Sequence, residues 1–446
     1  GTKSKTLRMT KPTVMYNGKA EEFADAAEAQ AFLDSHMKDG RLCYLKNDKK
    51  GKSDVLFVEN YEAYVVSRVD AENKKIVYNV YSVGKTDVET LDLSDKDVAK
   101  REVLVYDENG AALRPHTKTH KCPEIAKMQL EAGACGIAVA KTGEAEVMAQ
   151  HGIHDIFIAN EIVGDLKLRR IAKLAEDGVT ISFGVDTPCQ VESAERVFAE
   201  AGVRVPVLIE IEVGENRSGI IEEADFLALL DTIQTCPHVP FGGIFSHDGN
   251  SYNTESRETL EALSEGAQLR TLHFADLAAK HAMPCKTVSY GATPTFMNHV
   301  KLLPGITELR PGTYALMDAS QGHAIGTLDR CAATVLASVI SKPTATRTIL
   351  DVGAKGLTMQ SRTEGICATP GKGTIYGSGD VHIEKVFDEH AILNDKAFHD
   401  SVEVGDKVRI LPVHICPVCN LYETAYLIDG DEVVGELPIA CRGKLQ

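Results

Sequence analysis

The chain has 446 residues, too many for one small hydrophobic core, so two or three domains are expected. A hydrophobic content of 43% and a charged content of 25% are ordinary for a globular enzyme, and no apolar run is long enough to cross a bilayer. A formal net charge of −16 argues against nucleic acid and anionic membrane surfaces as partners and leaves small molecules as the expected ligands.

Residues 1–85 differ in pattern from the rest of the chain and carry no motif that suggests chemistry. A helix is expected over residues 20–38, then a polar linker at 46–52 and a β-hairpin with strands at 63–69 and 75–83. We therefore predict an N-terminal α+β accessory segment, whose role the sequence leaves open.

Between residues 86 and 325, short apolar runs alternate with amphipathic helical stretches. The buried strands are expected at 136–140, 156–159, 180–185, 205–213, 241–245 and 285–289, with helices at 123–132, 143–150, 166–176 and 188–201 among the connections. Strand–helix repetition implies parallel strands, and this many units favour a TIM-like (β/α)8 barrel over an open doubly wound sheet. No G-x-G-x-x-G motif opens a helix, which weakens a dinucleotide-binding interpretation.

From residue 326 to residue 446 the pattern becomes β-rich, with short strands bounded by Gly and Asp turns. The strands are expected at 335–340, 348–352, 373–376, 382–386, 407–412, 423–428 and 432–437. The overall class is therefore α/β: a barrel followed by an antiparallel β-domain, with the active site expected where the two meet.

The octapeptide RPHTKTHK, residues 114–121, comes after a short apolar run and precedes the helix expected at 123–132. Lys118 is therefore expected just after a barrel strand, at the end of the barrel where such folds hold their chemistry. Crowding by His116, His120 and Lys121 is expected to lower the pKa of Lys118, so that its free amine can react with an aldehyde. Taken alone, the cluster is equally compatible with a solvated basic loop.

His414 and Cys416 stand two positions apart after the apolar run at 407–412. If that strand continues to Cys416, both side chains point to one face. An imidazole and a soft thiolate favour zinc over magnesium or calcium, and two protein ligands leave positions for water or substrate. A His and a Cys at this spacing are more often ordinary core or surface residues, and Cys416 and Cys419 form a lone C-x-x-C without a second pair.

Two further loops end expected barrel strands with groups that suit a phosphorylated ligand. Gly291, Ala292 and Thr293 offer backbone N–H groups and a hydroxyl late in the barrel, where such folds commonly bind phosphate. Arg217 comes after the most apolar strand, although an ordinary salt-bridged turn is the alternative. A reactive lysine, a phosphate-binding loop, an arginine and a Lewis-acid metal together indicate pyridoxal 5'-phosphate, with its aldehyde on Lys118.

Over residues 86–446 the sequence resembles the D-serine dehydratase/D-threonine aldolase family of fold-type III pyridoxal-phosphate enzymes. The matching blocks occur in the family's order: RPHTKTHK at 114–121, TGEAEV at 142–147, GATPT at 291–295, ELRPGTY at 308–314, ILDVG at 349–353 and HICP at 414–417. The resemblance implies an alanine-racemase-like barrel plus a β-domain, usually in a homodimer. It also implies a Schiff base on Lys118, metal ligands His414 and Cys416, and cofactor contacts from His116, Arg217, Gly291, Ala292, Thr293 and Tyr314.

The resemblance leaves two reactions of a D-3-hydroxy amino acid open. A dehydratase removes the Cα proton and the β-hydroxyl, which the metal makes a better leaving group, and gives a 2-oxo acid and ammonia. An aldolase deprotonates the hydroxyl and breaks the Cα–Cβ bond, giving glycine and an aldehyde. Dehydratases of the family resemble this chain in using His-x-Cys with zinc, whereas its aldolases tend to carry Asp there, which suits Mn²⁺ or Mg²⁺. Cys416 therefore favours a zinc-dependent dehydratase of the D-serine or D-threo-3-hydroxyaspartate type.

A non-catalytic pyridoxal-phosphate-binding protein is the alternative from another class, with residues 1–85 as its interaction surface. His414 and Cys416 argue against it, because a cofactor carrier needs no Lewis acid. Eleven cysteines scattered along the chain are not typical of a disulfide framework, so we expect a reducing compartment, the cytoplasm. An organelle transit peptide removed after import is compatible with the same sequence.

Overall fold

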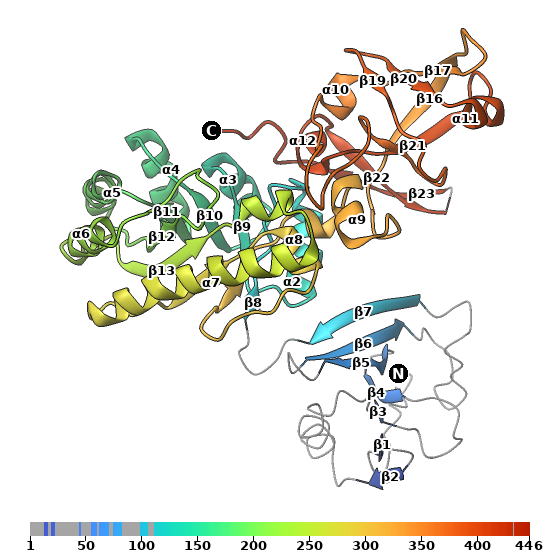
Figure 1. The fold of residues 1–446 in the computed structure, drawn as a ribbon. Coiled ribbons are helices and arrows are strands. Elements are labelled where there is room, and N and C mark those ends of the chain that lie inside the picture. Colours follow the sequence, from blue (N-terminus) through green and yellow to red (C-terminus); the bar gives the residue numbers. More distant parts are fainter. Residues whose placement is uncertain are drawn as a thin grey trace, which may run out of the picture. The chain divides into compact units, whose positions relative to one another are not determined.

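The computed structural model describes residues 111–430 and 432–446, together with the strands β1–β7 within the first 110 residues (Figure 1). The chain divides into two compact units, Gly1–Gly110 and Ala111–Gln446. The first unit includes β7, which begins after the boundary expected at residue 85. Within the described part of the chain, no helix is long and apolar enough to cross a membrane.

The first unit contains two antiparallel sheets with strand orders β2-β1-β3 and β4-β5-β6-β7. The strands are β1 (Thr13–Tyr16), β2 (Lys19–Glu22), β3 (Tyr44–Leu45), β4 (Val55–Glu59), β5 (Glu62–Asp70), β6 (Lys75–Ser82) and β7 (Ala99–Val105). The predicted hairpin is β5–β6, with Asp70 opposite Lys75. The predicted helix at 20–38 begins inside strand β2, and the rest of it lies outside the described residues, as does the linker at 46–52.

Eight parallel strands in the second unit form the predicted barrel. They are β8 (Ala112–Leu113), β9 (Ile137–Val139), β10 (Asp155–Glu161), β11 (Thr180–Val185), β12 (Val207–Ile211), β13 (Phe241–Ser246), β14 (Thr287–Tyr290) and β15 (Glu308–Leu309). Strand β15 pairs with β8, and the chain just after β8 closes the ring onto β9. There the N–H of Ala138 donates to Pro115 O at 2.8 Å, and the N–H of Thr117 donates to Ala138 O at 2.8 Å.

Helices cover the outer faces of the barrel strands (Figure 1). They are α2 (Pro123–Glu131), α3 (Thr142–Gln150), α4 (Asp165–Glu176), α5 (Pro188–Ala201), α6 (Glu223–Gln234) and α7 (Arg257–Lys280). The shorter elements η3 (Gly249–Asn253), α8 (Thr293–Met297), η4 (Thr313–Ala315) and α9 (Ala319–Ile325) follow the last barrel strands, and α9 packs against Leu411 of the β-domain. Helix α5 shows how local sequence sets such an element. Pro188 occupies the first turn of α5. The Gln190 side chain accepts hydrogen bonds from the N–H groups of Asp186 and Thr187, just before the helix. Gly202 ends the helix with a left-handed φ of +68°.

Two sets of apolar side chains alternate along the barrel strands. One set faces the helices and forms the main core, whereas the interior set consists of Ala138, Phe157, Leu208 and Phe245. The rings of Phe157 and Phe245 meet edge to face, with centroids 5.1 Å apart. This small interior cluster fills the barrel below its C-terminal rim and so provides a floor for a site above it.

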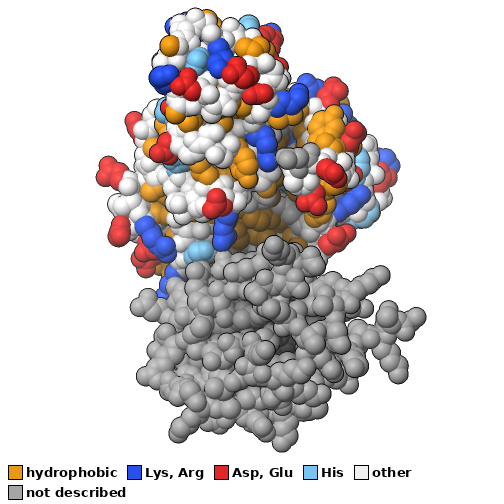
Figure 2. All heavy atoms as spheres, turned by 90° about the vertical axis from the view of Figure 1, so that its right-hand side faces the viewer, with side chains coloured by type: hydrophobic (Ala, Val, Ile, Leu, Met, Phe, Trp, Pro, Cys, Tyr) orange, Lys and Arg blue, Asp and Glu red, His pale blue; other side chains and the backbone are white. Residues whose placement is uncertain are grey.

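The predicted antiparallel β-domain comes after the barrel, with a six-stranded sheet of order β18-β21-β16-β17-β20-β19 and a separate β22–β23 ribbon. Its elements are β16 (Val335–Ser341), β17 (Arg347–Leu350), α10 (Ala354–Leu357), β18 (Thr374–Ile375), β19 (Lys385–Val386), β20 (Ala391–Asn394), α11 (Lys396–Ser401), β21 (Lys407–Leu411), α12 (Ile415–Cys419), β22 (Thr424–Asp429) and β23 (Glu432–Pro438). On the face shown in Figure 2, acidic and basic side chains of the described residues are interspersed.

After β23 the chain returns to the barrel. The N–H of Cys441 donates to Lys121 O at 3.0 Å, and Gln446 O accepts from the N–H of Gly143 at 3.1 Å. Between these contacts the buried side chains of Lys121 and Glu144 form an ion pair. Residues 439–446 therefore fasten the turn after β8 to the start of α3.

Candidate active site

A cavity of about 320 Å³ lies at the C-terminal ends of the barrel strands. Its wall is built from the segments that come after β8, β12, β13, β14 and β15, and from two segments of the β-domain. The interior residue Phe245 contributes to its lining. The cavity therefore lies where the barrel meets the β-domain, as the sequence predicts.

Lys118 and His116 both line this cavity, from the turn after β8. Burial lowers the pKa of Lys118 below its usual value, and Arg217 acts in the same direction, while Cys416 and Glu144 oppose the shift. Burial also lowers the pKa of His116 well below its usual value, helped by the charges of Lys118 and Arg310. The turn thus presents a poorly solvated amine and a neutral imidazole to the cavity.

The other basic residues of the octapeptide do not crowd Lys118 as expected. The His120 ring contacts Gln129 Oε1 at 3.2 Å and accepts from the N–H of Cys122 at 3.1 Å, and Lys121 pairs with Glu144. Neither His120 nor Lys121 lines the cavity, and the backbone at Lys121 is left-handed, with φ of 55°. Burial and Arg217, and not the neighbouring His120 and Lys121, therefore account for the lowered pKa of Lys118.

The remaining predicted cofactor residues separate into two groups. Arg217, Ala292 and Thr293 line the cavity, whereas Gly291 and Tyr314 do not. Gly291 has a φ of +137°, which favours glycine at the sharp turn between β14 and α8. The hydroxyl of Tyr314 accepts from Gln129 Nε2 at 2.9 Å, and burial raises the Tyr314 pKa to about 12. Tyr314 therefore supports the turn after β15 without lining the cavity.

Arg310 is a cavity residue that the sequence analysis left without a role. Its guanidinium lies 5.2 Å from the Phe245 ring centroid and donates to Ser289 Oγ and, at 2.7 Å, to Ser246 O. Ser289 in turn donates to Glu308 at 2.5 Å. Burial lowers the Arg310 pKa to about 10. The position of Arg310 directly after β15 is the feature of the sequence from which a role at the barrel rim could have been predicted.

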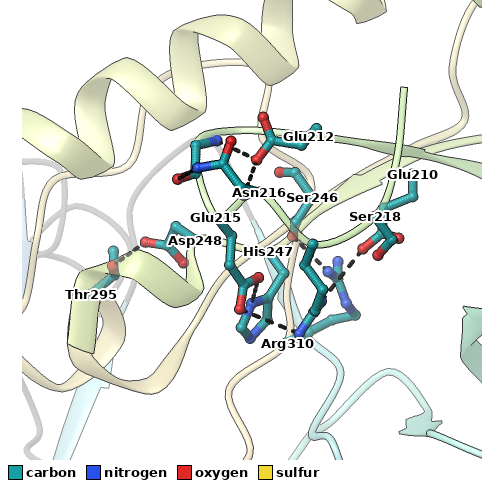
Figure 3. A network of polar contacts seen from close by, with 12 residues as sticks. Glu210, Glu212, Glu215, Asn216, Ser218, Ser246, His247, Asp248, Thr295 and Arg310 are labelled. Atoms are coloured by element: carbon teal, nitrogen blue, oxygen red, sulfur yellow. Dashed lines mark hydrogen bonds and ion pairs between the residues drawn. The ribbon is translucent and has the colours of Figure 1, made fainter. Parts of the chain in front are cut away.

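A second polar network includes Glu210, Ser218, Glu215 and His247 (Figure 3), and Arg217 forms ion pairs with both of these carboxylates. Nδ1 of His247 donates to Glu215 Oε2 at 2.9 Å, and Glu215 also forms an ion pair with Arg217 at 3.4 Å. Burial favours a high pKa for Glu215, but the His247 hydrogen bond and the charges of Arg217 and Lys118 hold it below its usual value. Glu210 adds a second carboxylate, 3.6 Å from Arg217, and accepts from Ser218 at 2.6 Å.

Glu161, at the end of β10, lies beside Glu210 of β12. Burial, the hydrogen bond to Glu210 and the charge of that carboxylate raise the pKa of Glu161 to about 8. Two carboxylates in contact cannot both ionise cheaply, so Glu161 holds a proton near neutral pH.

His414 and Cys416 both line the cavity, but the strand predicted at 407–412 does not continue to Cys416. Strand β21 ends at Leu411, before Pro412, and His414 is the residue that precedes helix α12. The Asp318 carboxylate accepts from the N–H of Ile415 at 3.0 Å and from the N–H of Gln321 at 2.9 Å. A turn that Asp318 fixes therefore directs both side chains to the cavity.

The environments of His414 and Cys416 suit metal ligands. Nδ1 of His414 donates to Gln360 Oε1 at 3.0 Å, which leaves Nε2 free, and burial lowers the His414 pKa to about 4. Cys416 Sγ lies 3.2 Å from the Thr119 hydroxyl and 3.5 Å from that of Thr313. Burial raises the Cys416 pKa, and these two hydroxyls oppose the shift. Across the described ranges 111–430 and 432–446, no group of three or more His, Cys, Asp and Glu side chains could hold a metal ion.

Comparisons with known proteins agree with this arrangement. Residues 101–320 match the model of the alanine racemase N-terminal domain, and residues 332–428 match that of a serine dehydratase domain. A D-threonine aldolase from Arthrobacter sp is 32% identical over 79% of this chain and 91% of its own length. The crystal structure of a D-threonine aldolase from Filomicrobium marinum has a TM-score of 0.68 and 29% identity, covering 76% of this chain and 90% of that one.

A D-threo-3-hydroxyaspartate dehydratase from Delftia sp. HT23 is equally similar in structure. Its TM-score is 0.68 at 27% identity, and the match covers 74% of this chain and 90% of that one. A variant of such a dehydratase with a cysteine replaced by alanine has been solved in a metal-free form. The aldolase and the dehydratase share the barrel and the β-domain seen here, and the chain belongs to the D-serine dehydratase/D-threonine aldolase family of alanine-racemase-like lyases.

Proposed function

We propose that this protein is a pyridoxal 5'-phosphate- and zinc-dependent dehydratase that converts D-3-hydroxy amino acids into a 2-oxo acid and ammonia. The observation that carries the proposal is that Lys118, His414 and Cys416 line one cavity. An amine of lowered pKa and two ligands suited to zinc are the groups that this reaction needs side by side.

The cavity has features that suit pyridoxal 5'-phosphate. Lys118 offers the amine for its aldehyde, and Ala292 and Thr293 meet Gly312 in one part of the lining. A Cβ at Gly312 would approach Thr119 Oγ1 to 2.9 Å and His116 O to 3.2 Å, so a larger residue would crowd this corner. The open backbone of two loops suits a phosphate, with Arg217 and Arg310 as further cations.

The zinc site would use His414 Nε2 and Cys416 Sγ. The hydrogen bond from His414 to Gln360 fixes the ring with Nε2 available, as carbonyl partners do for metal-bound histidines. Two protein ligands leave the other positions for water and for the substrate hydroxyl, which is typical of a catalytic zinc.

When bound at Lys118, the cofactor would supply an electron sink, and a zinc ion held by His414 and Cys416 would supply a Lewis acid. The chain's own residues do the rest. Lys118, whose lowered pKa favours the neutral amine, accepts the Cα proton in the substrate complex. Thr119 and Thr313 place hydroxyls at Cys416 Sγ and so favour the thiolate. From the β-domain, Arg362, His414 and Cys416 complete the cavity lining.

A D-threonine aldolase is the second candidate, because the relative from Arthrobacter sp carries that activity in its name and shares 32% identity. Aldol cleavage needs the substrate bound through its amino group in the same way. It differs in that a base must deprotonate the β-hydroxyl, whereas in the dehydratase reaction the β-hydroxyl leaves. His247, oriented by Glu215, is a neutral imidazole in the cavity that meets the chemical requirement for such a base. A homodimer is part of the proposal, since it is usual in the family that the sequence resembles.

Product analysis with a panel of D-3-hydroxy amino acids, with and without a chelator, separates the two reactions. The dehydratase proposal expects a 2-oxo acid and ammonia from D-serine or D-threo-3-hydroxyaspartate, lost with chelator and restored by zinc. Glycine and acetaldehyde from D-threonine, without 2-oxo acid, would establish the aldolase. Sedimentation of the same preparation measures whether the protein is a dimer.

A further inference from the structure

Arg362 reaches the cavity from the β-domain, in the loop between α10 and β18. This loop is fastened to the barrel segment η3, because the N–H of Ile366 donates to Thr254 O at 2.7 Å. Gly365 has a φ of +70°, and a Cβ there would come within 2.5 Å of the Asn253 backbone. Close backbone contact thus fixes where the Arg362 side chain enters the cavity.

The Arg362 guanidinium has fewer polar partners than the guanidinium groups of Arg217 and Arg310, which also line the cavity. Its carbon lies 4.5 Å from the ring centroid of Tyr252, and its Nε is buried without a hydrogen-bond partner in the described part of the chain. Among residues 111–430 and 432–446, no carboxylate forms an ion pair with it. Arg217, by contrast, is held by Glu210 and Glu215, and Arg310 donates to Ser289 and Ser246.

A guanidinium with an unused buried donor is a costly feature unless a ligand completes it. Carboxylates match the planar donor pairs of arginine better than any neutral group does, and stacking on Tyr252 holds that plane in one orientation. Because His414 and Lys118 line the same cavity, a substrate bound at those groups lies within the space that Arg362 faces.

We propose that Arg362 binds the α-carboxylate of the substrate. This inference rests on the proposed function, since it takes the substrate to be a 3-hydroxy amino acid. The α-carboxylate is the one anionic group that D-serine, D-threonine and D-3-hydroxyaspartate share, so a single arginine serves all three. Arg362 is thereby a specificity residue that selects acids over amides and orients the Cα–H bond toward the base.

The test compares Arg362→Gln and Arg362→Lys with a matched control, Arg409→Gln. Arg409 also stacks on a tyrosine of the β-domain, 4.4 Å from the ring centroid of Tyr376, but does not line the cavity. Calorimetry of the cofactor-loaded proteins measures the Kd of 3-hydroxypropanoate and of 3-hydroxypropanamide, which lack the amine and do not turn over. Arg362→Gln should weaken the acid about tenfold or more and leave the amide unchanged, with Arg362→Lys in between.

Kinetics give an independent readout. Arg362→Gln should raise KM for D-serine about tenfold with a smaller change in kcat, and should abolish the preference for D-serine over D-serinamide, whereas Arg409→Gln keeps both. Unchanged affinity for 3-hydroxypropanoate, or no binding of it by the wild-type protein, overturns the proposal. A loss confined to D-3-hydroxyaspartate overturns the α assignment in favour of the β-carboxylate. Absence of lyase activity in the wild type contradicts the proposed function, while the calorimetry still decides the role of Arg362.

Discussion

At the scale of single residues, the amine of Lys118 lies in the cavity wall, where burial and the charge of Arg217 lower its pKa. We expect Lys118→Ala to lose both the absorbance band of the cofactor–lysine linkage and turnover, the latter by at least about 10³-fold, because no other lysine of the described residues lines the cavity. Lys127→Ala, on the exposed side of α2, is the control and should keep both. Turnover near the wild-type rate in Lys118→Ala would contradict the assignment.

Cys416 and Cys419 lie on one short helix but in different surroundings, which gives a second test at the residue scale. Cys416 lines the cavity, whereas Cys419 packs into the core of the β-domain. Cys416→Asp should weaken zinc binding about 10- to 100-fold and reduce elimination, because a hard carboxylate replaces a soft thiolate. Cys419→Ala should keep zinc affinity. Zinc titration with a colorimetric competitor measures both, and an unchanged affinity in Cys416→Asp would show that Cys416 is not a ligand.

At the scale of elements, the ends of strands β10 and β12 bring Glu161 against Glu210 and raise the Glu161 pKa to about 8. The unfolded chain ionises Glu161 near its ordinary pKa, while the folded protein keeps it protonated until about pH 8. The contribution of this group to the free energy of unfolding therefore falls as the pH rises from about 5 to about 8 and changes little above that. Glu161→Gln mimics the protonated form and should remove about 1–3 kcal/mol of this pH-dependent loss.

Urea unfolding at several pH values across this range measures the difference. Glu192→Gln, on the exposed side of α5, is the matched control and should track the wild-type curve. If Glu161→Gln and the wild type lose stability in parallel across the range, Glu161 does not hold the proton.

At the scale of the whole molecule, the cavity and both cores next to it belong to residues 111–446. A chain of residues 108–446 should therefore keep the absorbance band of the bound cofactor and a cooperative thermal transition. Differential scanning calorimetry and a visible spectrum of the shortened and full chains provide the measurement. Failure of the shortened chain to bind the cofactor would show that the first unit is needed to build the site.

Sequence periodicity predicted the architecture where local signals are strong. Strand β11 and helix α5 have the predicted bounds, because continuous apolar runs, Pro188 and Gly202 mark them along the chain. Lys118 was predicted correctly at a strand end. The turn at His414 was not predicted. The signal for it was Pro412, which has no N–H to donate to a strand ladder and so marks the end of β21.

Other features depend on contacts between residues far apart in the sequence. Asp318 fixes the start of α12, Glu161 meets Glu210 across two barrel strands, and Arg362 enters from a loop without any recognisable motif. Pattern alone carries no information on such pairs, since each partner looks like an ordinary surface residue. The barrel could thus be predicted from the sequence, whereas the charges that complete the cavity could not.

The contact of residues 439–446 with the barrel has a consequence for biosynthesis. Cys441 and Glu144, which meet in the folded protein, are 297 positions apart in the chain. A ribosome adds about 5–20 residues per second, so the turn at residues 117–121 waits many seconds for its final support. The cavity that this turn lines is thus completed only once translation has passed the distal segment, and a nascent chain stalled before it holds an unfinished cavity wall.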